Sequence, residues 1–162
     1  MQASLGHMTA DMFWQNVNLP ARVEDEYLQL HELHPGVLEF LGRAIVKFSQ
    51  IMCLSNDVIE WSRKLRSRFG LEKYIRRWFI SGELHSRKPS KEIYQALADA
   101  CNCDTRSLVF VDDRAKNLLQ AKNMGMKTVL FGSALQPVPC DSLRRATDFR
   151  ELEAVLFGDG VG

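Results

Sequence analysis

The sequence lacks the features that mark membrane-spanning and nucleic-acid-binding proteins. No apolar run approaches the length of a transmembrane span, and no signal peptide opens the chain. The net charge is +1 over 162 residues, so neither nucleic acid nor an anionic membrane is an expected partner. These absences predict a cytoplasmic globular protein of one domain, or of one domain with a small appendage.

The sequence also has few residues that suggest a structural metal site or a redox centre. Cys53 lies in an apolar run, and the remaining cysteines follow no zinc or redox spacing. We therefore expect reduced cytosolic thiols. His31 and His34 stand three residues apart, but no third ligand is evident. A solvated helix end is the favoured interpretation of this histidine pair.

One stretch does carry a strong signal, and it runs from residue 108 to residue 117. Four apolar residues lead directly into Asp112 and Asp113, and a helical pattern follows that Gly125 closes. This order predicts a buried parallel strand, a turn and a crossover helix. Two adjacent carboxylates at the end of a strand repel each other. This repulsion favours a hard divalent cation bound by both carboxylates. The alternative is that Asp113 caps the following helix.

Helices and strands alternate along the rest of the chain. Amphipathic or capped helices are expected over residues 9–17, 20–33, 37–48, 58–69 and 90–100, with Ser90 as an N-cap. A last short helix follows Asp148, whereas residues 1–8 carry no pattern and residues 136–140 form a loop. The alternation predicts an α/β fold with a parallel sheet and right-handed crossovers. Its strands are expected at about 50–54, 77–80, 107–111 and 127–131.

Polar residues follow three of these strands. Ser55 and Asn56 come after the first, Lys88 follows the second and precedes a proline, and the acidic pair ends the third. In a parallel sheet, these groups would meet at the carboxyl edge. A hydroxyl, an amide, an ammonium group and a metal-binding carboxylate pair suit a phosphate group. The ordered set, more than any one residue, predicts a phosphate site.

These segments resemble motifs of the haloacid dehalogenase-like (HAD) hydrolases. The matching stretches are Leu54 to Asp57, Arg87-Lys88-Pro89, and Val109 to Arg114 with Asn117. The resemblance covers residues 9–157 and is greatest to the group with an inserted helical cap. It implies a HAD-like core over residues 35–158, with a Rossmann-like parallel sheet in three layers, and a remnant of the helical cap over residues 1–34. Residues 159–162 are expected to be a disordered tail.

The resemblance also implies an activity and roles for particular residues. The activity is a Mg²⁺-dependent phosphatase that acts on a small phosphorylated metabolite. Ser55, Asn56 and Lys88 would contact the phosphate, and Lys88 would also stabilise developing charge. Asp112 or Asp113 would bind Mg²⁺, with Asp113 in a catalytic role. Asn117 would support the acidic pair without binding the metal.

The sequence departs from the family at the nucleophile. The family uses an aspartate in an amino-terminal strand of the form DxDx[TV], and no such segment is present. Asp11 and Asp25 lie in helical patterns and cannot replace it. The missing strand would lie in the middle of the sheet, between the strands that end at Ser55 and Asp112. We therefore expect an amino-terminally truncated, inactive form whose open sheet edge could support oligomers.

Other readings remain beside this one. A non-catalytic pseudoenzyme or phosphate- and metal-binding scaffold would keep the pocket without the chemistry. A response-regulator receiver domain also uses an acidic pair, a hydroxyl and a lysine, but its acidic pair comes first in the chain. A nicotinamide-binding domain would need a glycine fingerprint that this sequence lacks.

Overall fold

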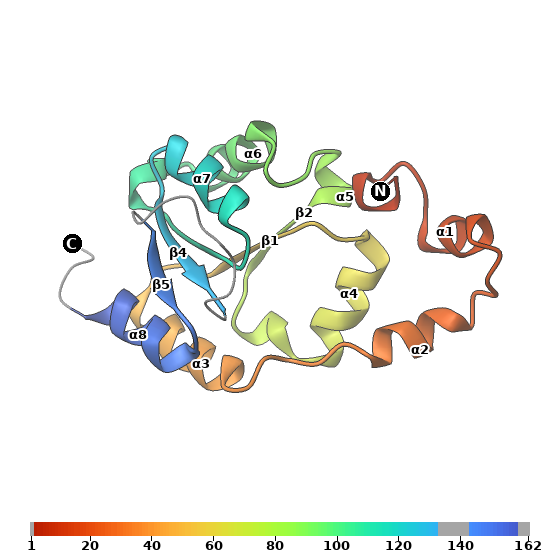
Figure 1. Cartoon of the computed structure of the whole chain (residues 1–162), viewed down its shortest axis with the longest axis horizontal. Helices are drawn as coiled ribbons and strands as arrows, with labels where there is room; N and C mark the ends of the chain where they lie inside the picture. Colours follow the sequence, from red (N-terminus) through yellow and green to blue (C-terminus); the bar gives the residue numbers. More distant parts are fainter. Residues whose placement is uncertain (1, 133–142, 159–162) are drawn as a thin grey trace. The chain divides into compact units, whose positions relative to one another are not determined.

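The computed structural model describes residues 2–132 and 143–158 (Figure 1). The chain divides into two compact units, which are described separately: an amino-terminal unit, Met1–Lys88, and a carboxy-terminal unit, Pro89–Gly162. Within the described residues, no helix is both long enough and apolar enough to cross a membrane. The predicted loop at 136–140, with Cys140, and the predicted tail at 159–162 lie outside the described residues.

The amino-terminal unit is built around two parallel strands. Strand β1 pairs with β2 in parallel, with Ser55 opposite Ile80. The predicted strand positions are confirmed to within two residues. The elements of this unit, in chain order, are η1 (Ala3–Leu5), α1 (Ala10–Asn16), α2 (Val23–Gln29), α3 (Val37–Lys47), β1 (Met52–Ser55), α4 (Ile59–Arg68), η2 (Leu71–Lys73), β2 (Arg77–Ile80) and α5 (Ser81–Leu84).

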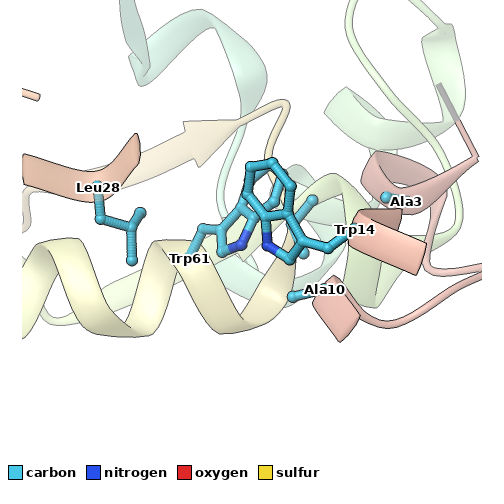
Figure 2. Packing of buried hydrophobic residues seen from close by; sticks show 6 residues of the cluster. Ala3, Ala10, Trp14, Leu28 and Trp61 are labelled. Carbon is cyan, nitrogen blue, oxygen red and sulfur yellow. The ribbon is translucent and has the colours of Figure 1, made fainter. Parts of the chain in front are cut away.

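An aromatic core holds helices α1, α2 and α4 together. Trp14 and Trp61 are buried, and their ring centres lie 5.6 Å apart (Figure 2). The Glu24 carboxylate is also buried and accepts a hydrogen bond from each indole N–H, both at 3.0 Å, and a third from Lys64. A buried carboxylate is stable only with such partners. The buried members of this core are Ala3, Ala10, Trp14, Leu28, Val58 and Trp61.

Helix α2 is shorter than the predicted 20–33 helix. It ends at Gln29, and nearby side chains donate hydrogen bonds to two of its last carbonyl groups. The Arg68 guanidinium donates to the carbonyl of Leu28 at 2.7 Å, and His31 Nδ1 donates to the carbonyl of Tyr27 at 3.1 Å. The same two carbonyls also accept the backbone N–H groups of Leu30 and His31, each at 3.2 Å, in the tight turn that ends the helix. His31 and His34 therefore both lie beyond the end of α2, with His31 half-buried and His34 exposed.

The carboxy-terminal unit contains a parallel sheet of order β3-β4-β5. Strand β5 was not predicted, because its three residues include two arginines and carry no apolar run. The N-cap by Asp148 is confirmed, since its carboxylate accepts the N–H groups of Arg150 and Glu151. Ser90 is at an N-cap position, but its hydroxyl donates to Glu92 instead of capping. The elements are α6 (Lys91–Cys101), η3 (Thr105–Ser107), β3 (Val109–Asp112), α7 (Ala115–Asn123), β4 (Lys127–Phe131), β5 (Arg144–Ala146) and α8 (Phe149–Phe157).

Candidate functional site

Asn56 and Lys88, predicted as phosphate ligands, are bonded to each other in the amino-terminal unit. The Asn56 amide donates to the Lys88 carbonyl at 2.9 Å, and the Lys88 N–H donates to Asn56 Oδ1 at 2.7 Å. The Lys88 ammonium also donates to the carbonyl of Leu54 at 2.7 Å. These three bonds fix Lys88 beside the carboxyl end of β1, where Ser55 is the last strand residue. The fold thus joins residues that are 32 positions apart in sequence.

Asp57 and Ser81 lie just after the carboxyl ends of β1 and β2. Ser81 was not predicted as a site residue. The Ser81 side chain is fully buried, and its hydroxyl accepts the Asp57 N–H at 3.0 Å and donates to the Ser4 carbonyl at 2.5 Å. The sequence did contain a signal for Ser81, because a serine stands at the end of each strand. Ser55 is the last residue of β1, and Ser81 is the first residue after β2. Asp57 Oδ1 accepts the N–H of Val58, the residue at the N-cap position of α4. The side chain of Asp57 therefore fixes the turn after β1.

Burial changes the acid–base properties of two groups near β1. Burial raises the pKa of the Asp57 carboxyl, while the Val58 N–H and the nearby His31 act in the opposite direction. Burial also raises the pKa of the Cys53 thiol to about 11, although the Lys88 charge lowers it slightly. The Cys53 thiol is therefore protonated at neutral pH.

The two acidic residues of the carboxy-terminal unit have different environments. Asp112 is buried, and its Oδ1 accepts hydrogen bonds from the Arg114 N–H and the Asn117 amide, both at 2.8 Å. Asp113 is exposed. The alternative in which Asp113 caps the following helix is wrong, because the N-cap residue is Arg114, whose own side chain makes no capping bond. The hydrogen bonds to Asp112 hold the turn after β3, whereas the Asp113 carboxylate is exposed to solvent.

The side chains around the acidic pair offer the oxygen ligands that a hard cation prefers, but they offer too few of them to complete its coordination shell. Asn117 Oδ1 is buried without a hydrogen-bond partner, and the Asn117 carbonyl accepts the buried Tyr94 hydroxyl at 2.9 Å. Mg²⁺ takes oxygen ligands and is often held by one or two carboxylates, with water and phosphate completing its shell. In the described part of the chain, no group of three metal-binding side chains is present. Asp113 and Asp112 would therefore hold such an ion only with outside ligands.

Comparison with known proteins decides the family. A family model for haloacid dehalogenase-like hydrolases matches residues 7–125. The chain belongs to this family. The fold agrees with solved structures of HAD proteins, although their sequences are distant.

Three solved structures illustrate the similarity of fold. A wild-type HAD family enzyme from Bacteroides thetaiotaomicron, in complex with magnesium and inorganic phosphate, is 19% identical over 85% of this chain and 76% of that chain, with a TM-score of 0.73. A HAD phosphatase from Thermococcus onnurineus is 15% identical over 95% of this chain and 73% of that chain, with a TM-score of 0.77. A dehalogenase is 21% identical over 88% and 67% of the two chains, with a TM-score of 0.71.

The structure brings the predicted site residues together in two sets. Asn56 and Lys88 are bonded within the amino-terminal unit, and Asp112 and Asn117 are bonded within the carboxy-terminal unit. The convergence of both sets on one phosphate stays a prediction.

Proposed function

We propose that this HAD-like hydrolase chain carries the phosphate-binding and magnesium-binding residues of a phosphatase for a small phosphorylated metabolite. The observation that carries the proposal is the triple anchoring of Lys88 through Asn56 and the Leu54 carbonyl. A lysine that only served solubility would not need such fixation, whereas one that meets a phosphate gains from it. The Ser55 hydroxyl and the Lys88 ammonium would then donate to phosphate oxygens.

We assign the two aspartates different roles within this proposal. Asp112 positions the turn through the Arg114 N–H and the Asn117 amide, and Asp113 supplies the exposed carboxylate that binds Mg²⁺. When bound, the cation would offset the negative charge of a phosphate group. The Asn117 Oδ1, buried and unpaired, supports an additional polar ligand such as metal-bound water.

We further propose that turnover needs a nucleophilic carboxylate strand that the given sequence lacks. The sheet edges support this proposal. β2 begins with exposed Arg77, and β5 carries exposed Arg144 and Arg145, which is how proteins protect a true edge. In contrast, β1 has the sequence MCLS and β3 the sequence VFVD, and both are at the end of their sheets. The composition of β1 and β3 is that of interior strands, which suits a further strand beside them.

Ligand-dependent stability tests the binding part of this proposal. We expect Mg²⁺ and inorganic phosphate each to raise the melting temperature, because a ligand at 100 times its Kd stabilises a fold by about 2.7 kcal/mol. Asp113→Asn should abolish the Mg²⁺ effect and Lys88→Met the phosphate effect. Asp25→Asn, which removes an exposed carboxylate elsewhere, is the matched control. Equal ligand effects in all variants would contradict the proposed site.

A second measurement tests whether both sets of residues act on one ligand. If they do, phosphate should bind more tightly with Mg²⁺ present, and by linkage Mg²⁺ should bind more tightly with phosphate present. Strictly additive stabilisation by the two ligands would indicate separate sites.

An activity assay separates the complete enzyme from the alternative, a non-catalytic pseudoenzyme or scaffold. With a generic phosphate ester and Mg²⁺, we expect negligible turnover from the chain as given. Robust turnover that Asp113→Asn abolishes would show that the nucleophile strand is not required. The coding sequence upstream of Met1 then distinguishes truncation from true loss, since an in-frame DxDx[TV] strand would indicate truncation.

A further inference from the structure

Two histidines that are far apart in sequence meet at the amino-terminal turn, away from the predicted phosphate ligands. The rings of His7 and His85 have centres 6.3 Å apart and planes inclined by 37°. His7 follows η1 and His85 follows α5, and both are exposed to solvent. Because both side chains are exposed, an ion from solution can reach them. Neither histidine has a role in the proposed phosphatase function.

Each imidazole has one nitrogen already occupied by an oxygen acceptor. His85 Nδ1 donates to the carbonyl of Leu5 at 2.9 Å, and His7 Nδ1 donates to Gln2 Oε1 at 2.8 Å. These bonds place the proton on Nδ1, so that the lone pair of each neutral ring is on Nε2. Histidines that bind metals usually have this arrangement, with the other ring N–H held by an oxygen.

The backbone beneath the two rings is held in place by the fold. The Ser81 hydroxyl donates to the Ser4 carbonyl at 2.5 Å, which attaches η1 to α5 (Figure 1). A Cβ on Gly6 would overlap the carbonyl oxygen of Gly82, so the two segments pack as closely as glycine permits. His85 has a φ of 50°, a left-handed conformation that few non-glycine residues adopt. Strained residues of this kind are concentrated at ligand sites.

We propose that His7 and His85 form a surface site for a divalent transition-metal ion such as Zn²⁺. Two imidazoles that share one tetrahedral Zn²⁺ at a Zn–N distance of about 2.0–2.1 Å have ring centres roughly 5 Å apart. The two exposed rings, whose centres are 6.3 Å apart, would therefore move about 1 Å closer to bind the ion. Imidazole favours Zn²⁺, Ni²⁺ or Cu²⁺ over Mg²⁺, so this site differs in chemistry from the proposed magnesium ligands. The described residues offer no group of three metal-binding side chains, so water or an outside ligand completes the coordination.

Occupancy of this site would stabilise the amino-terminal turn against α5. The bound ion adds a further link beside the Ser81–Ser4 and His85–Leu5 bonds. His85 also precedes Lys88 by three residues, so the ion would restrict the segment that carries this lysine. Zinc binding is therefore expected to raise the stability of the amino-terminal unit.

The test uses the untagged full chain, with Cys101, Cys103 and Cys140 changed to serine so that their thiols bind no zinc. Melting temperature is measured against ZnCl₂ concentration, and zinc affinity is measured by calorimetry. We expect saturable stabilisation, and an affinity at least about tenfold weaker in His7→Asn and in His85→Asn. Asparagine suits this comparison because its amide can replace the Nδ1–H donor and it tolerates positive φ, but it lacks the Nε2 ligand.

The four histidines of the chain supply the controls. His34→Ala removes another exposed imidazole and should bind zinc as the parent does, and MgCl₂ should not compete. The proposal is overturned if both asparagine variants keep the parental zinc affinity, or if His34→Ala loses it. If His85→Asn fails to fold, the His7→Asn variant decides the question, because His7 is exposed and precedes the first α-helix.

Discussion

At the scale of single residues, identical side chains in adjacent positions have different tasks. Asp112 and Asp113 look equivalent in the sequence, yet only Asp112 is buried and bonded to the following turn. The difference follows from their positions, because Asp112 is the last residue of β3 and Asp113 lies in the turn that follows it. The sequence could identify the acidic pair as a candidate site, but it could not show which of the two aspartates is structural and which is exposed.

This division predicts different effects on stability. Asp112→Ala should lower the free energy of unfolding by about 1–3 kcal/mol, because it leaves the Arg114 N–H and the Asn117 amide without their acceptor. Asp113→Ala should leave stability close to the parental value, since it removes an exposed side chain. Urea unfolding of both variants measures the difference. An equal loss in both would refute the assignment of Asp112 as the structural member.

Glu24 is a second residue whose role only the structure reveals, and its charge should make stability depend on pH. Burial acts to raise the pKa of Glu24, but the bonds from Lys64, Trp61 and Trp14 outweigh it and hold the pKa below its ordinary value of 4.5. A carboxyl with a lowered folded-state pKa stabilises the fold above its unfolded-state pKa, and the contribution is lost as the pH falls through the folded-state value.

We therefore expect Glu24→Gln to cost about 1–2 kcal/mol at pH 7, because the amide keeps the shape but loses the charge. The difference in unfolding free energy between parent and variant should shrink as the pH falls below the ordinary pKa of 4.5. Chemical denaturation at several pH values from 7 to about 3 measures this difference. A difference that stays constant over this range would show that Glu24 is not ionised in the fold.

At the scale of elements, the amino-terminal residues contribute more than their sequence suggests. Residues 1–8 carry no periodic pattern, yet η1 is bonded to α5 through Ser81 and His85. The contacts come from backbone carbonyls of η1, which no side-chain pattern can encode. The close approach of Gly6 to Gly82 is part of the same attachment.

A pair of glycine variants measures this attachment. Gly6 and Gly70 both have positive φ, of 73° and 63°, but a Cβ would meet the Gly82 carbonyl at Gly6 and only the end of the Lys73 side chain at Gly70. Both alanine variants should incur the conformational cost of roughly 1 kcal/mol. Gly6→Ala should lose more stability and expose η1 to faster amide hydrogen exchange. Similar losses in the two variants would mean that the backbone contact contributes little.

The sheet edges show a second feature at this scale. Arginines mark β2 and β5, whereas β1 and β3 carry none. The apolar side chains Val109, Phe110 and Val111 of β3 are only half-buried. A strand with interior composition at the end of a sheet is a site for association with another chain.

At the scale of the whole molecule, these edges predict self-association. We expect light scattering to show a mass that increases with protein concentration, and Val109→Lys to reduce the increase by adding charge to the exposed edge of β3. The matched control is Lys127→Val, which removes a charge from the partner position on β4. A monomer at all concentrations would contradict the prediction.

The sequence by itself determined the alternation of elements, four of the five described strands and the family. Apolar runs, caps and turn residues are local signals, so β1 to β4 and the Asp148 cap could be predicted from short segments. The motif residues were also recognisable, because their order along the chain is specific to the HAD-like hydrolases.

Only the tertiary structure decided which of these residues are bonded to one another. The reciprocal bonds between Asn56 and Lys88, the burial of Glu24 between two indoles and the meeting of His7 with His85 all join distant parts of the chain. Strand β5 and the hydrogen bond at the end of α2 likewise depend on partners from elsewhere in the fold. Local patterns record which residues are apolar or polar, but hydrogen bonds between distant residues depend on packing, and packing exists only in three dimensions.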